Sequence, residues 1–301
     1  MFLLSSRAPF YVTLRLAEES VVFLNNYLYF PQHMGMERNS KRTAVIVGGS
    51  SGIGYETCLK LVNRSWNVIN ISRTECPNER VTNICADASE RGALGKAIEL
   101  ITEKHPVSAL IYSAGFSMAA PIEYAKESDY RYLFDVNFFG ALEAMQAVIP
   151  SMKNSGGRII LVGSLGGDLP ICFDSFYSAS KAALEMLSRS AYSELRPYGI
   201  HVTGVLPGGT ATKFTFKRKV YSDDENKNYS SNVNRAVAAL ANMEQGGMSP
   251  AAVAEIVYNV LSEENPPVIR ICGAKNTMFR LFSRIMPEKF TLKINDRMYN
   301  Q

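Results

Sequence analysis

Residues 43–54 read TAVIVGGSSGIG, and this stretch decides the fold. Its first part, residues 43–47, is a short apolar run with β-branched side chains, which is typical of a strand buried in a parallel sheet. Three glycines follow in the spacing G-x-x-x-G-x-G, namely Gly48, Gly52 and Gly54. Residues 55–63 then read as a helix and residues 66–71 as a second strand. Strand, glycine turn, helix and strand in this order predict a β-α-β unit.

The same alternation continues along the chain. Further strands are expected at residues 81–84, 109–112, 158–162, 201–205 and 268–271. Helices are expected at residues 91–104, 128–153, 175–196 and 250–263. Seven strands that alternate with helices predict an α/β fold with a single doubly wound parallel sheet of about seven strands, the Rossmann fold. We expect one domain over residues 41–275, not two.

Composition and charge exclude several function classes. The chain has 301 residues, of which 47% are hydrophobic and 20% charged, so it can bury a substantial core. The net charge of +4 gives no electrostatic reason to expect nucleic acid as a partner. The five cysteines are scattered without a C-x-x-C pair, which argues against a disulfide framework or a zinc site and favours a cytoplasmic location. We expect no metal, and no apolar run is long enough for a transmembrane segment.

The first 40 residues are expected to form an N-terminal extension. Residues 21–24 and 27–30 are apolar clusters, separated by two asparagines. They suit either a membrane- or partner-binding segment or a loosely structured extension. We favour the second interpretation, because such short signals are weak and because Met34 and Met36 lie just ahead of the predicted domain.

The glycine turn predicts a dinucleotide site. Glycine accepts a positive φ in a tight turn and lets a pyrophosphate approach the backbone, and the helix that starts there offers free N–H groups and the positive end of its dipole. A rival interpretation is the G-x-S-x-G nucleophile elbow of hydrolases, with Ser50 as the nucleophile. It is disfavoured because His105 follows a predicted helix and His201 opens a predicted strand, so neither follows the carboxyl end of a strand.

The carboxyl end of the second strand predicts which nucleotide binds. An NAD site needs an acidic residue there to accept a hydrogen bond from the ribose 2′-hydroxyl. This chain has Ser72 and Arg73 instead, and no acid until Glu75. The planar guanidinium of Arg73 can pair with a 2′-phosphate, and the Ser72 hydroxyl adds a donor. We therefore predict NADP(H) as the cofactor.

A Y-x-x-x-K pair near the start of the helix expected at 175–196 predicts acid–base chemistry. The spacing of four residues places Tyr177 and Lys181 on one helix face, so that the ammonium would lower the pKa of the phenol from its usual value of about 10. Ser164 lies at the carboxyl end of a predicted strand, where ligands bind in open α/β sheets. Asn137 is an indifferent helix former inside a predicted helix, which indicates a polar role.

Over about residues 41–275, the order of these motifs resembles the short-chain dehydrogenase/reductase family of the classical type. After the glycine turn come Asp87 with Ala88, the triplet Ser113-Ala114-Gly115, the tetrad Asn137, Ser164, Tyr177 and Lys181, and finally Pro207, Gly208 and Thr212. Tyr112 and Ser113 replace both asparagines of the family's N-N-A-G motif. Together with Arg73, the resemblance implies that NADP(H) is bound by Gly48, Ser50, Ser51, Gly52, Ile53, Gly54, Ser72, Arg73, Asp87, Ala88, Ser113, Ala114, Gly115, Tyr177, Lys181, Pro207, Gly208, Thr210 and Thr212.

The resemblance also implies a role for each member of the tetrad. Tyr177 would donate a proton to a substrate carbonyl as hydride arrives from nicotinamide, and would take the alcohol proton in the reverse direction. Ser164 would hydrogen-bond the same oxygen, Lys181 would bind the nicotinamide ribose, and Asn137 would hold a water that links Lys181 to solvent. The alternative is a regulatory protein that binds NADP(H) without the chemistry. The complete tetrad favours the enzyme.

Residues 213–247 match the substrate lid of that family, and their number indicates a sizeable substrate. The predicted substrate contacts are Ser164, Leu165, Phe173, Tyr177 and Phe214. An apolar wall with few charges favours a hydrophobic secondary alcohol or ketone, steroid-like or lipid-like. The sequence also resembles the branch that contains hydroxysteroid, retinol and ketosphinganine dehydrogenases. We expect a homodimer or a homotetramer.

Residues 276–301 form a C-terminal tail with an amphipathic pattern. Apolar side chains follow one helix face at Met278, Leu281, Phe282, Ile285 and Met286, opposite Arg280, Ser283 and Arg284. Such a helix suits an anionic membrane surface, a cover for the substrate cleft, or packing on its own domain or on a neighbouring subunit. We expect the segment to border the substrate entrance rather than to anchor the protein; if its apolar side chains dock, their burial contributes several kcal/mol.

Overall fold

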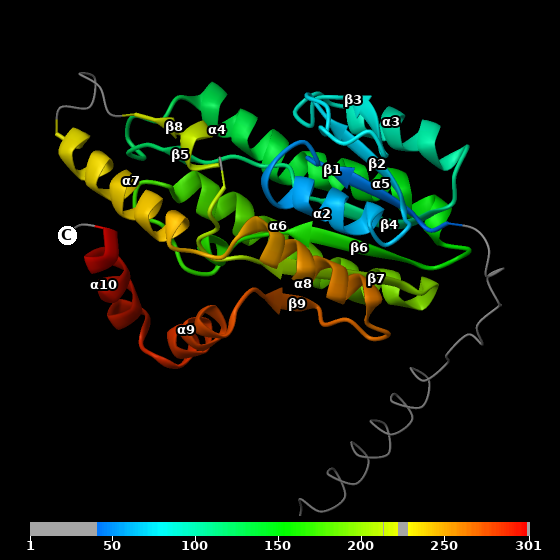
Figure 1. Cartoon of the computed structure of the whole chain (residues 1–301). Coiled ribbons are helices and arrows are strands. Elements are labelled where there is room, and N and C mark those ends of the chain that lie inside the picture. The colour runs from blue at the N-terminus through cyan, green and yellow to red at the C-terminus, as the bar shows by residue number, and fades with distance from the viewer. Residues whose placement is uncertain (1–40, 213, 222–227, 300–301) are drawn as a thin grey trace, which may run out of the picture. The chain divides into compact units, whose positions relative to one another are not determined.

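The computed structural model describes residues 41–212, 214–221 and 228–299. The predicted extension over residues 1–40 lies outside the described residues. Within the described part, helices cover both faces of one central sheet (Figure 1).

The central sheet has seven parallel strands in the order β3-β2-β1-β4-β6-β7-β9. They are β1 (Thr43–Val47), β2 (Asn67–Ser72), β3 (Val81–Cys85), β4 (Val107–Tyr112), β6 (Gly157–Val162), β7 (Ile200–Leu206) and β9 (Ile269–Ile271). The order runs outward from β1 in both directions, so the chain crosses over between β1 and β4. The predicted doubly wound parallel sheet is therefore confirmed, and the crossover is the position at which such sheets bind ligands.

Two helical layers enclose the sheet. One face is covered by α2 (Gly52–Val62) and α8 (Pro250–Ser262), and the other by α3 (Ala93–Thr102), α5 (Gly140–Met152) and α6 (Ser175–Leu195). Alternate side chains of β1 enter the two cores: Ala44 and Ile46 pack under α2 and α8, and Val45 and Val47 under the other layer. Burial on both faces explains why this strand reads as a continuous apolar run.

The helix expected over residues 128–153 consists of three parts. It begins as α4 (Glu127–Phe134), passes through a π-helical turn at Asp135–Phe139 and continues as α5. Such turns insert an extra residue into a helix and are frequent at functional sites. This one carries Asn137, which is fully buried.

The predicted lid region contains secondary structure that the sequence pattern did not indicate. Its second half is the helix α7 (Ser230–Gln245), and its first half includes the short strand β8 (Lys219–Val220), which pairs with β5 (Met118–Ala119). Two-residue strands are too short to leave a periodic signal. The fully or nearly fully buried apolar side chains of α7 are few, at Val233, Ala236 and Leu240, so its pattern is also weak.

The C-terminal tail folds as α9 (Ala274–Ile285) and α10 (Glu288–Tyr299). The apolar face of the first helix is exposed and does not pack on its own domain. Met278, Leu281 and Ile285 are 72%, 61% and 71% exposed, whereas Arg280 is only 4% exposed. The charged side of α9 faces the domain, because two carboxylates there bind its arginine, as described below.

Tyr112 links the sheet to the π-helical turn. It ends β4, is fully buried, and its hydroxyl donates a hydrogen bond to the carbonyl of Val136. At Gly140, a Cβ atom would lie 2.6 Å from that hydroxyl, so the start of α5 also packs directly on it. The tyrosine that departs from the family motif therefore helps to place Asn137.

We predict that Tyr112→Phe lowers the free energy of unfolding by about 1–2 kcal/mol, because the Val136 carbonyl loses its donor inside the core. Urea denaturation followed by circular dichroism measures the change. The control is Tyr198→Phe, since that tyrosine is 45% exposed and its substitution should leave the unfolding midpoint unchanged. Equal effects of the two substitutions would contradict the assignment.

Candidate active site

A large pocket lies along the carboxyl ends of the parallel strands. Its volume is about 1740 Å³, and its lining runs from the glycine turn after β1, past the ends of β2 and β4, to Tyr177 and the C-terminal helices. Every residue predicted to bind the cofactor lines this pocket except Gly54. The sequence motifs, which are far apart in the chain, therefore meet in one place.

The glycine turn is held by close backbone contacts. Gly48 has a φ of +88°, and a Cβ atom there would lie 2.7 Å from the backbone nitrogen of Ala114. A Cβ atom on Gly54 would lie 2.1 Å from the Gly48 carbonyl oxygen. Gly54 therefore serves the approach of α2 to the turn rather than the pocket wall. The packing puts the first turn of α2, with its free N–H groups, at the pocket.

The stretch from Pro207 to Thr212 closes the other side of this part of the pocket. The Thr210 hydroxyl donates a hydrogen bond to the Gly208 carbonyl, at 3.1 Å. A Cβ atom on Gly52 would lie 3.5 Å from the methyl group of Thr212, so the stretch reaches across to the glycine turn. The glycine turn, predicted to bind the pyrophosphate, and this second cofactor-binding stretch are thus neighbours.

At the end of β2, the guanidinium of Arg73 lies at the rim of the pocket. The side chain is 67% exposed, its Nη1 donates a hydrogen bond to the Tyr132 hydroxyl at 2.9 Å, and the same nitrogen lies 3.7 Å from Oδ2 of Asp87. Asp87 in turn accepts hydrogen bonds from the backbone nitrogen and the hydroxyl of Ser89. Ser72 and Ala88 line the pocket beside them. Tyr132 was not predicted, because it comes from α4, 59 residues away.

Tyr177 is buried next to Ser164. Burial raises the pKa of the Tyr177 phenol, and a hydrogen bond with the Ser164 side chain lowers it, without offsetting the burial. A phenol with a raised pKa is protonated at neutral pH. The Ser164 hydroxyl also accepts a hydrogen bond from the backbone nitrogen of Gly166, at 3.0 Å, which holds it at the turn after β6.

Lys181 lies over the ring of this tyrosine, and the effect of its ammonium on the phenol stays a prediction. Its Nζ lies 5.8 Å from the centre of the Tyr177 ring and donates a hydrogen bond to the Val162 carbonyl, at 3.0 Å. Burial lowers the pKa of Lys181 from 10.5 to about 8. Burial dominates the pKa of the phenol, and the ammonium is turned toward the end of β6.

Asn137 lies behind the pocket wall. Its side-chain amide donates hydrogen bonds to the Phe116 carbonyl and to the Ser180 hydroxyl and accepts one from the Phe116 nitrogen, all at 3.0 Å. A Cβ atom on Gly115 would lie 3.1 Å from Oδ1 of Asn137 and 3.4 Å from Nζ of Lys181. Asn137 and Lys181 thus flank Gly115, while the water that was assigned to Asn137 stays a prediction.

The predicted substrate residues divide into two groups. Ser164, Leu165, Tyr177 and Phe214 line the pocket, and the rings of Tyr177 and Phe214 lie 5.8 Å apart between their centres. Phe173 does not line it. That residue has a φ of +62°, and its ring packs on Tyr229, 6.3 Å away, in a cluster with α7.

A buried ionic cluster beside Tyr177 was missed. Arg218 donates hydrogen bonds to the Ser117 hydroxyl at 2.8 Å and to Glu244 at 2.6 Å, and its Nε lies 3.8 Å from Oδ2 of Asp174. Burial raises the pKa of Asp174 to about 7. Residues from the lid, from α7 and from the start of α6 are joined here. A local sequence pattern cannot predict such a cluster, since neighbouring members lie more than 20 residues apart in the chain.

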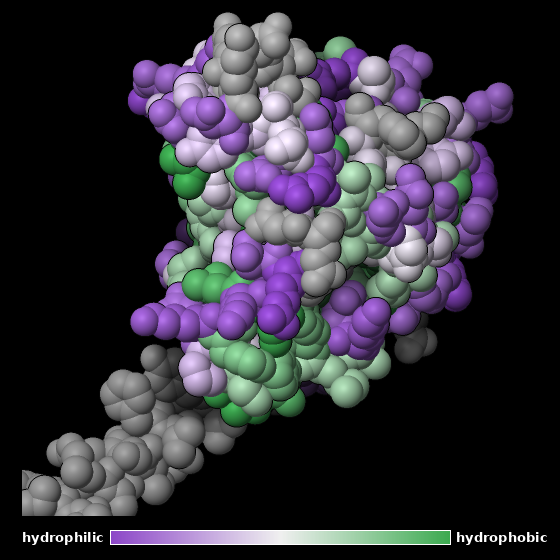
Figure 2. All heavy atoms as spheres, turned by 90° about the vertical axis from the view of Figure 1, so that its left-hand side faces the viewer, coloured by the Kyte–Doolittle hydropathy of each residue, from purple (hydrophilic) through white to green (hydrophobic). Residues whose placement is uncertain are grey.

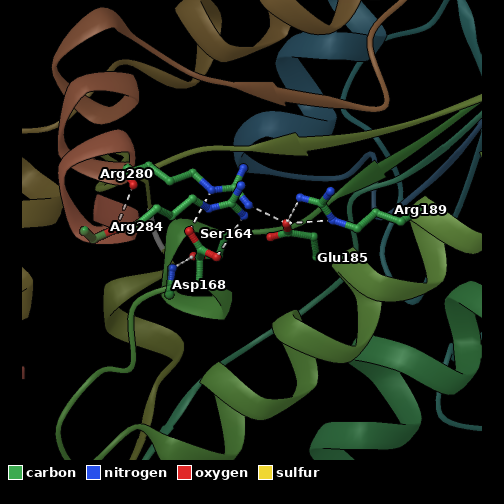
Figure 3. Close-up of polar contacts among 8 residues, drawn as sticks. Ser164, Asp168, Glu185, Arg189, Arg280 and Arg284 are labelled. Atoms are coloured by element: carbon green, nitrogen blue, oxygen red, sulfur yellow. Dashed lines mark hydrogen bonds and ion pairs between the residues drawn. The ribbon is translucent and has the colours of Figure 1, made fainter. Parts of the chain in front are cut away.

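A second ionic cluster binds α9 to the site (Figure 3). Nε of Arg280 donates to Asp168 at 2.7 Å, and its Nη2 donates to Glu185, which also pairs with Arg189. Arg284 lies 3.4 Å from Asp168. Asp168 follows the short turn after Ser164, and Glu185 lies one helical turn beyond Lys181. The C-terminal helix is therefore tied to both segments that carry the predicted catalytic residues.

Residues 41–212, 214–221 and 228–299 show neither a metal site nor a membrane span. No group of three or more His, Cys, Asp or Glu side chains in that part of the chain has the arrangement of a metal site. None of its helices is long and apolar enough to cross a membrane.

Comparison with known proteins gives consistent results. The family model for short chain dehydrogenase matches residues 42–221. A 3-ketodihydrosphingosine reductase of Bacteroides thetaiotaomicron is 30% identical over 227 residues, which cover 74% of this chain and 84% of that protein. The human 11-beta-hydroxysteroid dehydrogenase type 2 is 32% identical over 182 residues, 56% of this chain and 45% of that protein. A short-chain dehydrogenase structure from Streptomyces avermitilis superimposes with a TM-score of 0.73 and 26% identity, covering 85% of this chain and 96% of that chain.

The buried ammonium of Lys181 leads to a prediction about stability and pH. We expect Lys181→Met to raise the free energy of unfolding at about pH 7 by about 1–3 kcal/mol, because a charge no longer has to be buried. The folded-state pKa lies near 8, below the ordinary 10.5, so the cost is fully present below about pH 8. Between about pH 8 and 10.5, Lys181 is deprotonated in the folded wild type but still protonated in the unfolded chain, so the wild type gains stability as the pH rises. The difference in the free energy of unfolding between Lys181→Met and the wild type should therefore become smaller over this range.

Urea unfolding without added nucleotide, repeated across that pH range, measures this difference. The control is Lys96→Met on α3, where the lysine is exposed and no pH-dependent difference should arise. A Lys181→Met protein that is less stable than the wild type at neutral pH would show that the ammonium stabilises the fold.

Proposed function

The chain belongs to the short-chain dehydrogenase family, and from that premise we propose that it is an NADP(H)-dependent oxidoreductase that interconverts a hydrophobic secondary alcohol and its ketone. One observation carries the proposal: Ser164, Tyr177 and Lys181 line the same pocket as the glycine turn and Arg73. The pocket thus offers, in one cavity, an acid–base group, a hydrogen-bond donor beside it, and the donors that a dinucleotide requires.

The residues present fit a nicotinamide dinucleotide with a 2′-phosphate. The first turn of α2 supplies backbone donors for a pyrophosphate at a turn where side chains have no room. Arg73 and Ser72 at the end of β2 supply a cation and a hydroxyl, and the carboxylate there, Asp87, lies against the arginine. When bound, the nicotinamide supplies or takes up a hydride.

Side chains of the protein donate and accept the proton of the reaction. In the reduction direction, the protonated phenol of Tyr177 donates to the substrate oxygen, and Ser164 stabilises the negative charge that develops there. The ammonium of Lys181 is bound to the carbonyl of Val162 at the end of β6 and lies near the ring of Tyr177. Asn137 positions Gly115 and the Phe116 backbone on the same side. In the oxidation direction, the same phenol oxygen has to receive the alcohol proton.

The lining of the pocket supports a hydrophobic substrate, steroid-like or lipid-like. Apolar side chains face it from the turn after Ser164, from the lid and from α7, namely Leu165, Leu169, Ile171, Phe214, Leu240 and Met243. Arg218 and Glu244, which also line it, pair with each other. The two relatives described above are named for a sphingoid and a steroid substrate. A panel of ketosteroids, retinal, long-chain ketones and polar ketones, followed by NADPH oxidation, tests this class. The cytoplasmic location and the homodimeric or homotetrameric state stay predictions.

We predict that Tyr177→Phe lowers turnover at least about a hundredfold, since positioned acid–base groups contribute about 10²–10⁴-fold. NADPH affinity should stay within a few-fold, because the glycine turn and Arg73 carry it. Steady-state kinetics and NADPH fluorescence titration measure the two quantities. Tyr192→Phe, further along the same helix, is the matched control and should retain full activity. A Tyr177→Phe enzyme with more than about a tenth of wild-type turnover would refute the assignment.

We also predict that Arg73→Asp shifts the preference from NADP(H) toward NAD(H). The substitution removes the partner of a 2′-phosphate and installs a carboxylate that repels it but accepts from a 2′-hydroxyl. The measured quantity is the ratio of kcat/KM for the two cofactors. Arg91→Asp makes the same charge change on an exposed arginine outside the pocket lining and should leave the ratio unaltered. If Arg73→Asp leaves it unaltered too, Arg73 does not select the nucleotide.

A further inference from the structure

Exposed apolar side chains gather on the C-terminal helices. Twelve large apolar side chains are exposed in the described part of the chain, and six of them lie between residues 278 and 292. Four are on α9 with the spacing i, i+3, i+4, i+7, which puts them on one helix face: Met278, Leu281, Phe282 and Ile285. Figure 2 shows apolar surface, in green, gathered at the lower end of the view. A cluster of this kind marks an interaction surface more often than scattered single side chains do.

The ionic cluster of Figure 3 explains why this face points outward. Arg280 is buried between Asp168 and Glu185, and Arg284 lies against Asp168. Rotating α9 to bury its apolar side would leave Asp168 without a cation and Glu185 with Arg189 alone, and breaking a buried ion pair from one side is strongly destabilising. The helix is thus held with its apolar side exposed. The exposed face is a property of the folded chain.

The charges of the two C-terminal helices indicate what the face contacts. Besides the buried Arg280, α9 and α10 carry five exposed cations, namely Lys275, Arg284, Lys289, Lys293 and Arg297, and two exposed acids, namely Glu288 and Asp296. Five minus two leaves a net charge of +3. Apolar side chains accompanied by Lys and Arg are the pattern of helices that lie on anionic lipid. A second copy of this chain would bring the same positive charge against itself across a two-fold interface.

The apolar face continues into the pocket. Met278, Phe279 and Phe282 line the pocket that holds Tyr177, and Asn295 and Tyr299 of α10 line it as well. The tail thus lines the pocket, and its place at the substrate entrance stays a prediction. A surface in contact with this face would also lie beside this part of the pocket.

We propose that the outward face of α9, formed by Met278, Leu281, Phe282 and Ile285, docks on an anionic lipid bilayer and holds the mouth of the pocket at that surface. The docking requires no chemistry at Tyr177, so it stands or falls independently of the proposed function. If both are correct, an apolar substrate passes from the bilayer into the pocket without crossing bulk water.

The test is flotation of the purified full-length protein with vesicles of phosphatidylcholine alone or mixed with phosphatidylglycerol. We expect binding to the mixed vesicles, weaker binding to phosphatidylcholine, and loss of the difference at high salt, which screens the charges. The double substitution Leu281→Gln with Ile285→Gln should lower the partition coefficient at least about tenfold, because two apolar side chains no longer enter the bilayer.

The control is Leu100→Gln with Met186→Gln on α3 and α6. These side chains are 57% and 63% exposed, close to the 61% and 71% of Leu281 and Ile285. Their substitution should leave flotation unchanged. Three results would overturn the proposal. They are flotation that survives the α9 substitutions, flotation that the control pair reduces equally, and no binding to the mixed vesicles at all. Analytical sedimentation of the same variants tests whether a second copy of the chain covers this face instead. If the wild type is a dimer that binds no lipid, and the Leu281→Gln, Ile285→Gln variant is a monomer, the face belongs to a dimer interface.

Discussion

The approach of the helix α2 to the turn before it governs the rest of the structure. A Cβ atom on Gly54 would lie 2.1 Å from the Gly48 carbonyl oxygen, and one on Gly48 would lie 2.7 Å from the Ala114 nitrogen. No side chain fits at either position, so the turn after β1 approaches α2 and Ala114 through backbone atoms. This contact lies at the crossover of the sheet and leaves the free N–H groups of α2 at the pocket. The cofactor site is thus built from a packing requirement of the fold.

The surroundings of the proposed catalytic side chains favour their uncharged forms. Lys181 and Tyr177 are both buried, and burial shifts the pKa of the lysine downward and that of the tyrosine upward. The surroundings hold them through short-range contacts. Lys181 is bound by the end of β6, and a Cβ atom on Gly167 would lie 2.7 Å from its backbone carbon, so the turn after Ser164 packs on the same helix. Active sites commonly keep such unfavourable burial because function needs it, and the surrounding core compensates.

Two ionic clusters connect distant segments to this centre. Arg218 joins the lid to α7 and to the start of α6, and Arg280 joins α9 to the turn after Ser164 and to the middle of α6. Both arginines are nearly completely buried, and each is paired with two carboxylates. Such pairs add little net stability compared with an apolar core but make one arrangement much better than its alternatives. They therefore set where the lid and the C-terminal helices lie around the pocket.

The sequence by itself determined the order of the seven sheet strands along the chain, the glycine turn and the positions of Ser164, Tyr177 and Lys181. These follow from local patterns, since an apolar run, a glycine spacing and a four-residue interval are readable within one or two elements. The partners of Arg73 and Arg218, the turn of Phe173 away from the pocket and the orientation of α9 were decided only by the tertiary structure. Periodicity shows which side chains of α9 share a face, but the face that docks depends on Asp168 and Glu185, more than 90 residues away. Because these two carboxylates meet a buried arginine, the charged side of the helix faces the domain and its apolar side faces outward.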